Sequence, residues 1–313
     1  MKIGLQLYDF NWPGSPTTIR SKLSEIAQTA EKMGFNSLWL MDHLFQIGNG
    51  FGDHPSDPML EGYTTLSFLA GLTNTINLGL MVTGNVNRDP GMLIKIVSTL
   101  DVLSEGRTYL GIGTGWFANE VRGLGMYFPP TKKELIDRLE ETLQIAHQMW
   151  KGDDSPFTGK YYHLENPICS PQPISQPHPP ILIGFESEKV MPKVAAKYAD
   201  AINLHLGIGY DRFPNRQPMK DWYKDRKNRI SRKLDILNKC CDNIGRDYDT
   251  IEKTVLGTIK LGSNAMTSDQ IVELCYELAD LGIHHVIFNM PNTHEIDPLF
   301  IIGKEVIPKI KSL

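Results

Sequence analysis

Cysteines are few in this chain, and they are scattered. Among 313 residues there are four, at Cys169, Cys240, Cys241 and Cys275. Two of them are adjacent and the other two are isolated, so their spacing suits neither a disulfide framework nor a zinc site. We therefore expect a reducing, cytoplasmic environment in which the cysteines act as small buried hydrophobic residues.

Long apolar runs and an excess of positive charge are lacking as well. No stretch approaches the roughly 20 apolar residues that a membrane-spanning helix needs. The first ten residues, MKIGLQLYDF, resemble a strand and not a secretory signal. A net charge of −4 offers no basic surface to nucleic acid or acidic lipid. We expect a cytoplasmic protein with neither a nucleic-acid nor a membrane partner.

Strand-like and helix-like segments alternate eight times along the chain. The expected strands are short apolar runs, as in sheets covered on both faces: residues 2–7, 37–41, 76–82, 109–112, 181–183, 201–204, 255–261 and 285–289. Helix patterns follow them, with starts predicted at Ser15-Pro16, Asp89-Pro90 and Asp297-Pro298 and capping boxes at Thr131–Glu134 and Thr267–Gln270.

This alternation predicts an α/β fold of parallel strands with right-handed crossovers. Eight units favour a closed (β/α)8 TIM barrel, which commonly needs about 250 residues plus insertions. No Pro/Ser-rich linker divides the chain, so residues 1–313 are expected to form a single domain. An open, doubly wound sheet is the alternative.

Two segments fit neither helix nor strand. Residues 45–62, after the second expected strand, are rich in Gly, Pro and Asp, and residues 152–180, before the fifth, contain PQPISQPHPP. Irregular segments of this length in a compact domain are usually functional. We expect both insertions to lie at the active face of the barrel.

Catalytic residues of such barrels lie where strands end and the following loops begin. The residues at these positions are Asp42, His43, Thr83 to Asn87, Gly113 to Trp116, Glu120, Gly184 to Ser187, His205 and Asn289. They contain no His and carboxylate trio of the catalytic zinc type, and no serine lies in a G-x-S-x-G motif. This set suits a flat organic cofactor that performs the chemistry itself, with no metal.

Several blocks of the sequence also resemble a known family. The blocks LWLMDHLFQ, LGLMVTGNVNRDPGMLIKIVSTLDVLSEGR, LGIGTGWFANEVRGLGMYFPP and PQPISQPHPPILIG are similar to the luciferase-like monooxygenase superfamily, especially its branch of probable F420-dependent oxidoreductases. The likeness runs in order along almost the whole chain. It implies reduced FMN or the deazaflavin coenzyme F420, and hydride transfer or oxygenation of a small organic substrate. It also implies a homodimer, supplied by a flavin reductase or an F420-reducing enzyme.

The resemblance assigns roles to residues at three strand ends. His43, with Asp42 beside it, corresponds to the histidine next to the reactive ring, and a His can exchange protons near neutral pH. A non-proline cis peptide is implied between Met81 and Val82, so these two residues and Thr83 would form the cofactor bed. The alternative is that Asp42 and His43 merely cap a turn.

The next strand end is expected to wall the cofactor pocket. The resemblance places Thr114, Gly115 and Trp116 there, whereas tight packing of strand into loop is the structural alternative. Glu120 either caps the following helix or touches substrate. His205 and the pair His284-His285 are expected to be structural.

The segment Gly184-Phe185-Glu186-Ser187 is expected to bind the phosphate of the cofactor at a helix N-terminus. The deazaflavin branch has a run of glycines here, whereas bacterial luciferase has a Glu-Ser pair, like this chain. A free Glu186 carboxylate would repel a phosphate, and Phe185 adds bulk where a long tail would run. These residues favour FMN, and they predict that Ser187→Ala weakens FMN binding while Glu186→Gly improves deazaflavin binding.

Two other classes of protein remain as alternatives. A barrel that binds flavin without catalysis would keep the pocket but need no active histidine. A metal-dependent barrel hydrolase would need His and carboxylate ligands on several strand ends. Substitution of His43 and metal analysis distinguish these classes from an oxidoreductase.

Overall fold

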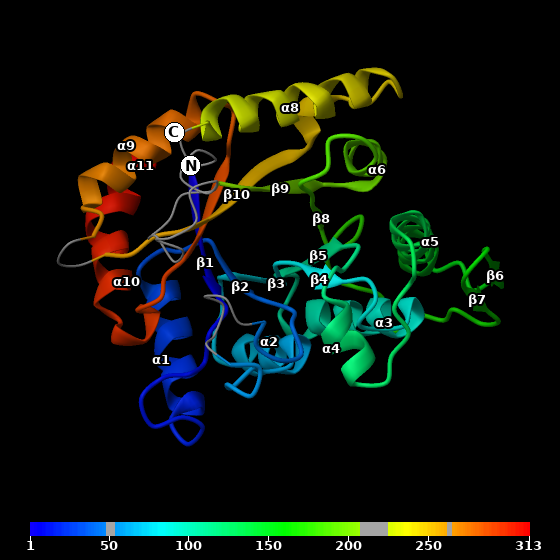
Figure 1. The fold of residues 1–313 in the computed structure, drawn as a ribbon, viewed down its shortest axis with the longest axis horizontal. Coiled ribbons are helices and arrows are strands. Elements are labelled where there is room, and N and C mark those ends of the chain that lie inside the picture. The colour runs from blue at the N-terminus through cyan, green and yellow to red at the C-terminus, as the bar shows by residue number, and fades with distance from the viewer. Residues whose placement is uncertain (48–53, 207–224, 262–264) are drawn as a thin grey trace.

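The computed structural model describes residues 1–47, 54–206, 225–261 and 265–313 (Figure 1). Residues 48–53 of the first expected insertion lie outside this part of the chain. Parallel strands form a sheet whose bounds are β1 Lys2–Leu7, β2 Ser37–Leu40, β3 Asn77–Leu80, β4 Thr83–Gly84, β5 Thr108–Gly113, β8 Ile181–Gly184, β9 Ala201–His205, β10 Glu252–Thr258 and β11 His285–Asn289.

The sheet closes on itself. Its order is β3-β2-β1-β11-β10-β9-β8-β5-β4, and β3 also pairs with β5. Strands β3 and β4 together make the third barrel strand, and between them lies a cis peptide joining Met81 and Val82. The closed barrel excludes the open sheet and confirms the predicted (β/α)8 fold, and the cis peptide is confirmed as well.

Helices follow the strands on the outside of the barrel (Figure 1). Their bounds are α1 Ile19–Lys32, α2 Gly62–Ala70, α3 Pro90–Leu103, α4 Ala118–Gly123, α5 Lys132–Trp150, α6 Met191–Tyr198, α8 Arg226–Asp242, α9 Ser268–Ala279, α10 Asp297–Ile301 and α11 Ile307–Ile310. Within the described residues, none of these helices combines the length and apolar character needed to cross a membrane.

A large aromatic side chain helps to fill the barrel interior. Trp39 on β2 is completely buried and clusters with Met81, Leu182 and Ile287 from other strands. Its indole needs Gly79 on β3, because a Cβ there would lie 2.5 Å from Trp39 Cζ3. The apolar runs therefore fill both faces of the strands, as expected for a parallel sheet.

One predicted helix start was wrong, and one predicted capping box forms only in part. Helix α1 begins at Ile19, and Ser15 instead closes a turn by donating to the carbonyl of Phe10 at 2.7 Å. Only half of the box at Thr131 forms, because the Glu134 carboxylate binds Tyr127 and Arg138 instead of returning to the Thr131 N–H. The second box, at Thr267 and Gln270, is complete.

The two ends of the second insertion do not lie at the active face, where they were expected. It leaves the end of α5 and returns at the first residue of β8, so both of its ends are at the amino edge of the barrel. A small hairpin within it, β6 Phe157–Thr158 and β7 His163–Leu164, lies outside α5 (Figure 1). The prediction was wrong for these ends, because α5 carries the chain back to the opposite edge before the insertion begins. Tyr162 of the hairpin nevertheless lines a pocket together with residues 85–89 of the loop after β4.

Candidate active site

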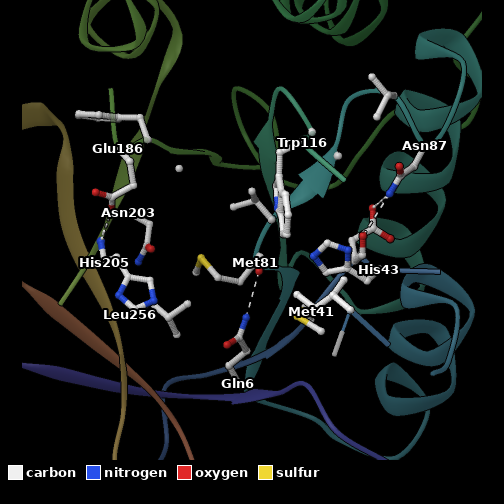
Figure 2. A pocket seen from close by; sticks show the side chains of 18 of the residues that line it. Gln6, Met41, His43, Met81, Asn87, Trp116, Glu186, Asn203, His205 and Leu256 are labelled. Atoms are coloured by element: carbon white, nitrogen blue, oxygen red, sulfur yellow. Dashed lines mark hydrogen bonds between the residues drawn. The ribbon is translucent and has the colours of Figure 1, made fainter. Parts of the chain in front are cut away.

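A cavity of about 480 Å³ opens at the carboxyl ends of the barrel strands. Its volume lies in the range of about 300–1,000 Å³ that is usual for small-molecule and cofactor sites. Of the predicted site residues, those that line it are Asp42, His43, Met81, Val82, Gly115, Trp116, Gly184, Phe185 and Glu186 (Figure 2). Thr83, Thr114 and Ser187 do not line it, whereas Gln6, Met41, Asn203 and Leu256, which the sequence analysis did not single out, do.

His43 is held by a carboxylate from α4, the short helix that follows β5. Its Nδ1 lies 2.8 Å from Oε1 of the buried Glu120, while the other oxygen of Glu120 accepts the backbone N–H of Leu44 at 2.8 Å. The rings of Trp116 and Phe117 meet the imidazole edge to face, with centroids 5.7 and 6.0 Å away. With Nδ1 turned to Glu120, Nε2 is the nitrogen available to a molecule in the cavity.

The structure thus gives Glu120 a third role, which neither of its two predicted roles had described. It is the partner of His43 and it also lines the cavity. Local sequence signals could not show this, because the two residues are 77 positions apart and meet only when the barrel closes.

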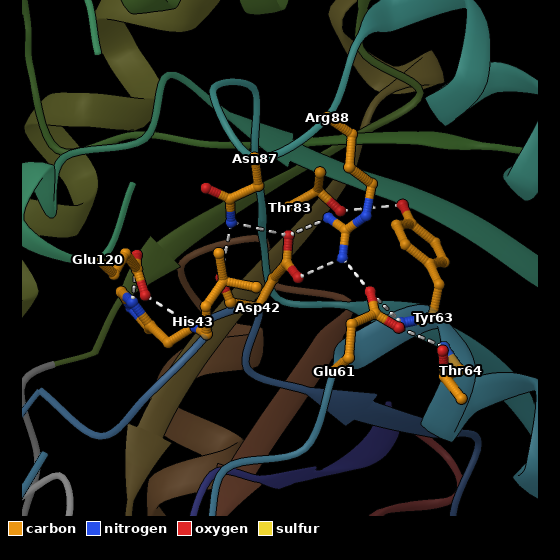
Figure 3. Close-up of polar contacts among 10 residues, drawn as sticks. Asp42, His43, Glu61, Tyr63, Thr64, Thr83, Asn87, Arg88 and Glu120 are labelled. Atoms are coloured by element: carbon orange, nitrogen blue, oxygen red, sulfur yellow. Dashed lines mark hydrogen bonds and ion pairs between the residues drawn. The ribbon is translucent and has the colours of Figure 1, made fainter. Parts of the chain in front are cut away.

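Asp42, unlike the adjacent His43, is bound by the side chains of Arg88 and Asn87. Its fully buried side chain accepts two bonds from Arg88, Nη1 to Oδ2 at 2.7 Å and Nη2 to Oδ1 at 3.0 Å. Asn87 adds a third bond to Oδ2 at 3.3 Å (Figure 3). A carboxylate bound on both oxygens by a guanidinium is suited to positioning and not to accepting protons.

The floor of the cavity is a chain of buried amides. Gln6 Nε2 donates to the carbonyl of Met81 at 3.0 Å (Figure 2). Gln6 Oε1 accepts from Asn289 Nδ2 at 3.0 Å. The buried Oδ1 of Asn289 has no partner among the described residues. Such an acceptor suits an N–H group of a planar ligand. Gln6 is a polar residue among the apolar residues of β1, and this contrast in the sequence could have identified it as a site residue.

Glycines let a flat ligand approach the backbone of this site. Gly115 has a φ of +77°, and a Cβ there would lie 2.6 Å from Val86 Cγ2. At Gly184 a Cβ would lie 3.3 Å from Val82 Cγ1. Both features fit a ring system that rests against the strand ends, with apolar contacts from Met81 and Leu256. The residues present therefore fit a flavin or deazaflavin ring.

The predicted phosphate segment has a different environment from the one expected. The Glu186 carboxylate accepts the N–H of His205 at 3.0 Å, and it forms ion pairs with Lys233 and with Arg229, the latter at 3.8 Å. Because both cations come from α8 and are buried, Glu186 is not a free negative charge. Ser187 is exposed and accepts the N–H of Lys189 at 3.4 Å, and α6 begins only at Met191.

The fold and this site define a (β/α)8-barrel protein with a cofactor bed at the carboxyl ends of its strands. Within the described residues, no group of three or more His, Cys, Asp or Glu side chains is arranged to hold a metal ion. The family model for luciferase-like monooxygenases matches residues 1–213, and the chain belongs to that family.

Its curated relatives include F420-dependent enzymes. The chain is 25% identical over 329 residues to the F420-dependent glucose-6-phosphate dehydrogenase of Nakamurella multipartita, covering 94% of this chain and 93% of that one. It is 26% identical to the corresponding enzyme of Microbacterium testaceum, covering 93% and 94%. An F420-dependent hydroxymycolic acid dehydrogenase of Mycobacterium tuberculosis is 30% identical over 56% of this chain and 46% of that one.

Solved structures share the whole fold. Coenzyme F420-dependent tetrahydromethanopterin reductase from Methanopyrus kandleri has a TM-score of 0.76 at 17% identity, covering 99% of each chain. The FMN complex of the oxygenating constituent of 3,6-diketocamphane monooxygenase from Pseudomonas putida has a TM-score of 0.74 at 17% identity, again covering 99% of each. Family, relatives and site together make the chain a flavin- or deazaflavin-dependent oxidoreductase.

Proposed function

We propose that this protein transfers a hydride between a small alcohol or carbonyl substrate and a deazaflavin coenzyme of the F420 type. The contact of His43 with Glu120 at 2.8 Å supports the proposal most strongly, since an imidazole held in this way at the cavity wall is suited to carry a proton. The coenzyme, when bound, accepts or supplies the hydride at its ring. The protein has to supply a binding surface, a fixed geometry and a path for the proton.

In this reaction His43 accepts and donates the substrate proton. A substrate hydroxyl bonded to Nε2 would give its proton to the imidazole as the hydride leaves the carbon, which yields a carbonyl product. The buried Glu120 carboxylate stabilises the imidazolium that forms and keeps Nδ1 protonated. In the opposite direction the same imidazolium donates its proton to the carbonyl oxygen.

Two observations support the deazaflavin over FMN. Full-length relatives from two organisms are F420-dependent dehydrogenases. The argument for FMN assumed a free charge on Glu186, but its pairing with Lys233 and Arg229 removes the repulsion that a phosphate would meet. FMN with oxygenation is the second candidate, favoured by the bulk of Phe185 in the cavity wall.

Cofactor titration tests the proposal. We expect the deazaflavin coenzyme to bind with micromolar affinity or better, about −8 kcal/mol, and more tightly than FMN when followed by fluorescence. FMN binding alone would favour the second candidate, and failure of both to bind would refute a flavin-type site. Metal analysis of the same sample tests the hydrolase alternative, and loss of turnover in a His43 variant that still binds coenzyme rejects a non-catalytic binder.

We also propose that the protein works as a cytoplasmic homodimer and depends on an F420-reducing enzyme for reduced coenzyme. Light scattering on the purified protein tests the oligomeric state. A coupled assay with such a reductase tests the supply of coenzyme.

A further inference from the structure

Arg88 lies between Asp42 and Glu61, where three chain segments meet (Figure 3). Its guanidinium binds both oxygens of Asp42, at 2.7 and 3.0 Å, and the same Nη2 that reaches Asp42 also forms an ion pair with Glu61. The guanidinium carbon stands 4.8 Å from the centre of the Tyr63 ring. The Arg88 side chain is 11% exposed and that of Asp42 is completely buried, so the Asp42 contact is shielded from solvent.

The two carboxylates on Arg88 mark the ends of one segment. Asp42 follows β2, Glu61 precedes α2, and the chain between them begins with His43. Glu61 also caps α2, because its oxygens accept the N–H groups of Tyr63 at 3.3 Å and Thr64 at 2.7 Å. One guanidinium therefore ties the end of a strand, the start of a helix and its own loop after β4.

Two further contacts tighten this arrangement. Asn87, next to Arg88, donates to the backbone carbonyl of Asp42 at 3.1 Å. The hydroxyl groups of Tyr63 and Thr83 lie 2.9 Å apart, which joins α2 to β4.

Burial alone would raise the pKa of Glu61, but its bonds with Thr64 and Arg88 outweigh burial and lower the pKa. Glu61 is thus ionised at neutral pH, and the positive N-terminus of α2 offsets the second carboxylate.

We infer that Arg88 is a positioning residue for His43, which it fixes by holding both ends of the segment that carries this histidine. Glu120 then orients the imidazole from the opposite side. The role depends on the planar fork of arginine, because a lysine ammonium cannot bind both oxygens of Asp42 and still reach Glu61 in a fixed plane. This inference rests on the proposed function, in which His43 moves the proton.

The first test compares two buried arginines. Among the described residues, the Arg107 guanidinium donates to the Thr73 hydroxyl and to backbone carbonyls at the amino edge of the barrel, so Arg107→Met is a matched control. We expect Arg88→Met to lower kcat by about 10²-fold, the scale of a displacement of about 1 Å, with KM and coenzyme Kd within about threefold. Arg107→Met should lower the melting temperature and leave kcat within about threefold of wild type. Equal kcat losses in both variants would overturn the inference.

The second test reads the imidazole without turnover. Arg88→Met leaves the Asp42 carboxylate buried and unpaired, so the double variant Asp42→Asn/Arg88→Met serves as a version with neither charge. In histidine-labelled protein, the His43 ring signal is assigned by its loss in His43→Gln. We expect this signal to shift and broaden in the double variant but not in Arg107→Met.

The two tests also separate the inference from the proposed function. A folded Arg88 variant with an unchanged His43 signal and wild-type kcat would refute positioning by Arg88. Wild type that fails to turn over with the deazaflavin would refute the proposed function, and the ring signal would still report whether Arg88 positions His43.

Discussion

His43 and Glu120 are the residues on which the proposed chemistry depends. Replacing the imidazole with an amide of similar size removes the proton carrier. It leaves the apolar side chains Met81 and Leu256 and the buried amide of Gln6 in the cavity wall. We expect His43→Gln to lower kcat by about 10²- to 10⁴-fold, the usual contribution of general acid–base catalysis, with little change in coenzyme Kd. His163→Gln is the control, since that histidine is exposed on the outer hairpin. Equal losses of folding and binding in His43→Gln would mark this histidine as structural.

Glu120→Gln tests the second half of the pair. The amide can still bond to Nδ1, but it cannot stabilise an imidazolium by charge. A charge-assisted bond is worth about 1.5–3 kcal/mol, so we expect kcat to fall by about ten- to hundredfold, measured under saturating coenzyme. Wild-type kcat in a folded Glu120→Gln variant would show that the 2.8 Å contact plays no part in turnover.

At this scale the sequence predicted that His43 lies at the mouth of the barrel, where it lines the cavity, but it did not predict the partners of His43. The strand-end position of His43 was visible because it follows an apolar run. Its partner Glu120 lies 77 positions further along the chain. Arg88, which binds Asp42, lies 46 positions after that aspartate. Periodicity shows which residues reach the mouth of a barrel, but it does not show which of them pair there.

Among the elements, the turn after β5 shapes the cofactor bed most directly. Gly115 combines a φ of +77° with a Cβ position only 2.6 Å from Val86. We expect Gly115→Ala to lower the free energy of unfolding by about 1–3 kcal/mol and to weaken coenzyme binding, as measured by urea denaturation and fluorescence titration. In Gly115→Ala/Val86→Ala the clash is relieved but the backbone strain stays, so only part of the stability should return. Full recovery would mean that crowding alone requires the glycine.

Element boundaries were less predictable than element order. Each strand was located within three residues of its observed start, yet α1 starts later than Pro16 because a turn around Ser15 precedes it. Residues 184–187 were predicted to lie at a helix N-terminus, but α6 begins only at Met191. In the loop before α6, the Glu186 carboxylate accepts the backbone N–H of His205. A local turn precedes the first of these helices and long-range contacts of Glu186 precede the second, and helix propensity describes neither.

Two histidines, the buried His285 and the half-buried His205, link the stability of the whole molecule to pH. Burial lowers the pKa of His205 and His285 below the ordinary value of about 6.5. Below pH 6.5 the unfolded chain therefore binds more protons than the folded chain, so this stability is present above that pH. It is lost as pH falls towards the lower folded pKa values.

Urea denaturation between pH 7.5 and 5.5 measures this effect. We expect the free energy of unfolding to fall on acidification, with each histidine contributing at most about 1.4 kcal/mol per pH unit. His205→Gln should flatten the pH dependence below pH 6.5, whereas His163→Gln should not, because His163 is exposed. Stability that rose as the pH fell from 7.5 to 5.5 would contradict the predicted sign.

The architecture of the whole molecule was the most predictable feature. Eight alternating units predicted the barrel, and only the pairing of β3 with β5 was needed to choose closure over an open sheet. The surroundings of Glu186, on which the argument between the two cofactors turns, could not be predicted, because its ion-pair partners come from α8, 43 or more positions further along the chain.

Reduction of the deazaflavin coenzyme by substrate tests the central claim most directly. The protein is mixed with oxidised coenzyme and a panel of small alcohols deuterated at the carbinol carbon, and the visible absorption of the coenzyme is followed. The account predicts that at least one alcohol bleaches the coenzyme, that the deuterium appears on its ring, and that His43→Gln binds the coenzyme but bleaches it at least about 10²-fold more slowly. Bleaching at the wild-type rate in His43→Gln, or deuterium released to water instead of carried to the ring, would contradict it.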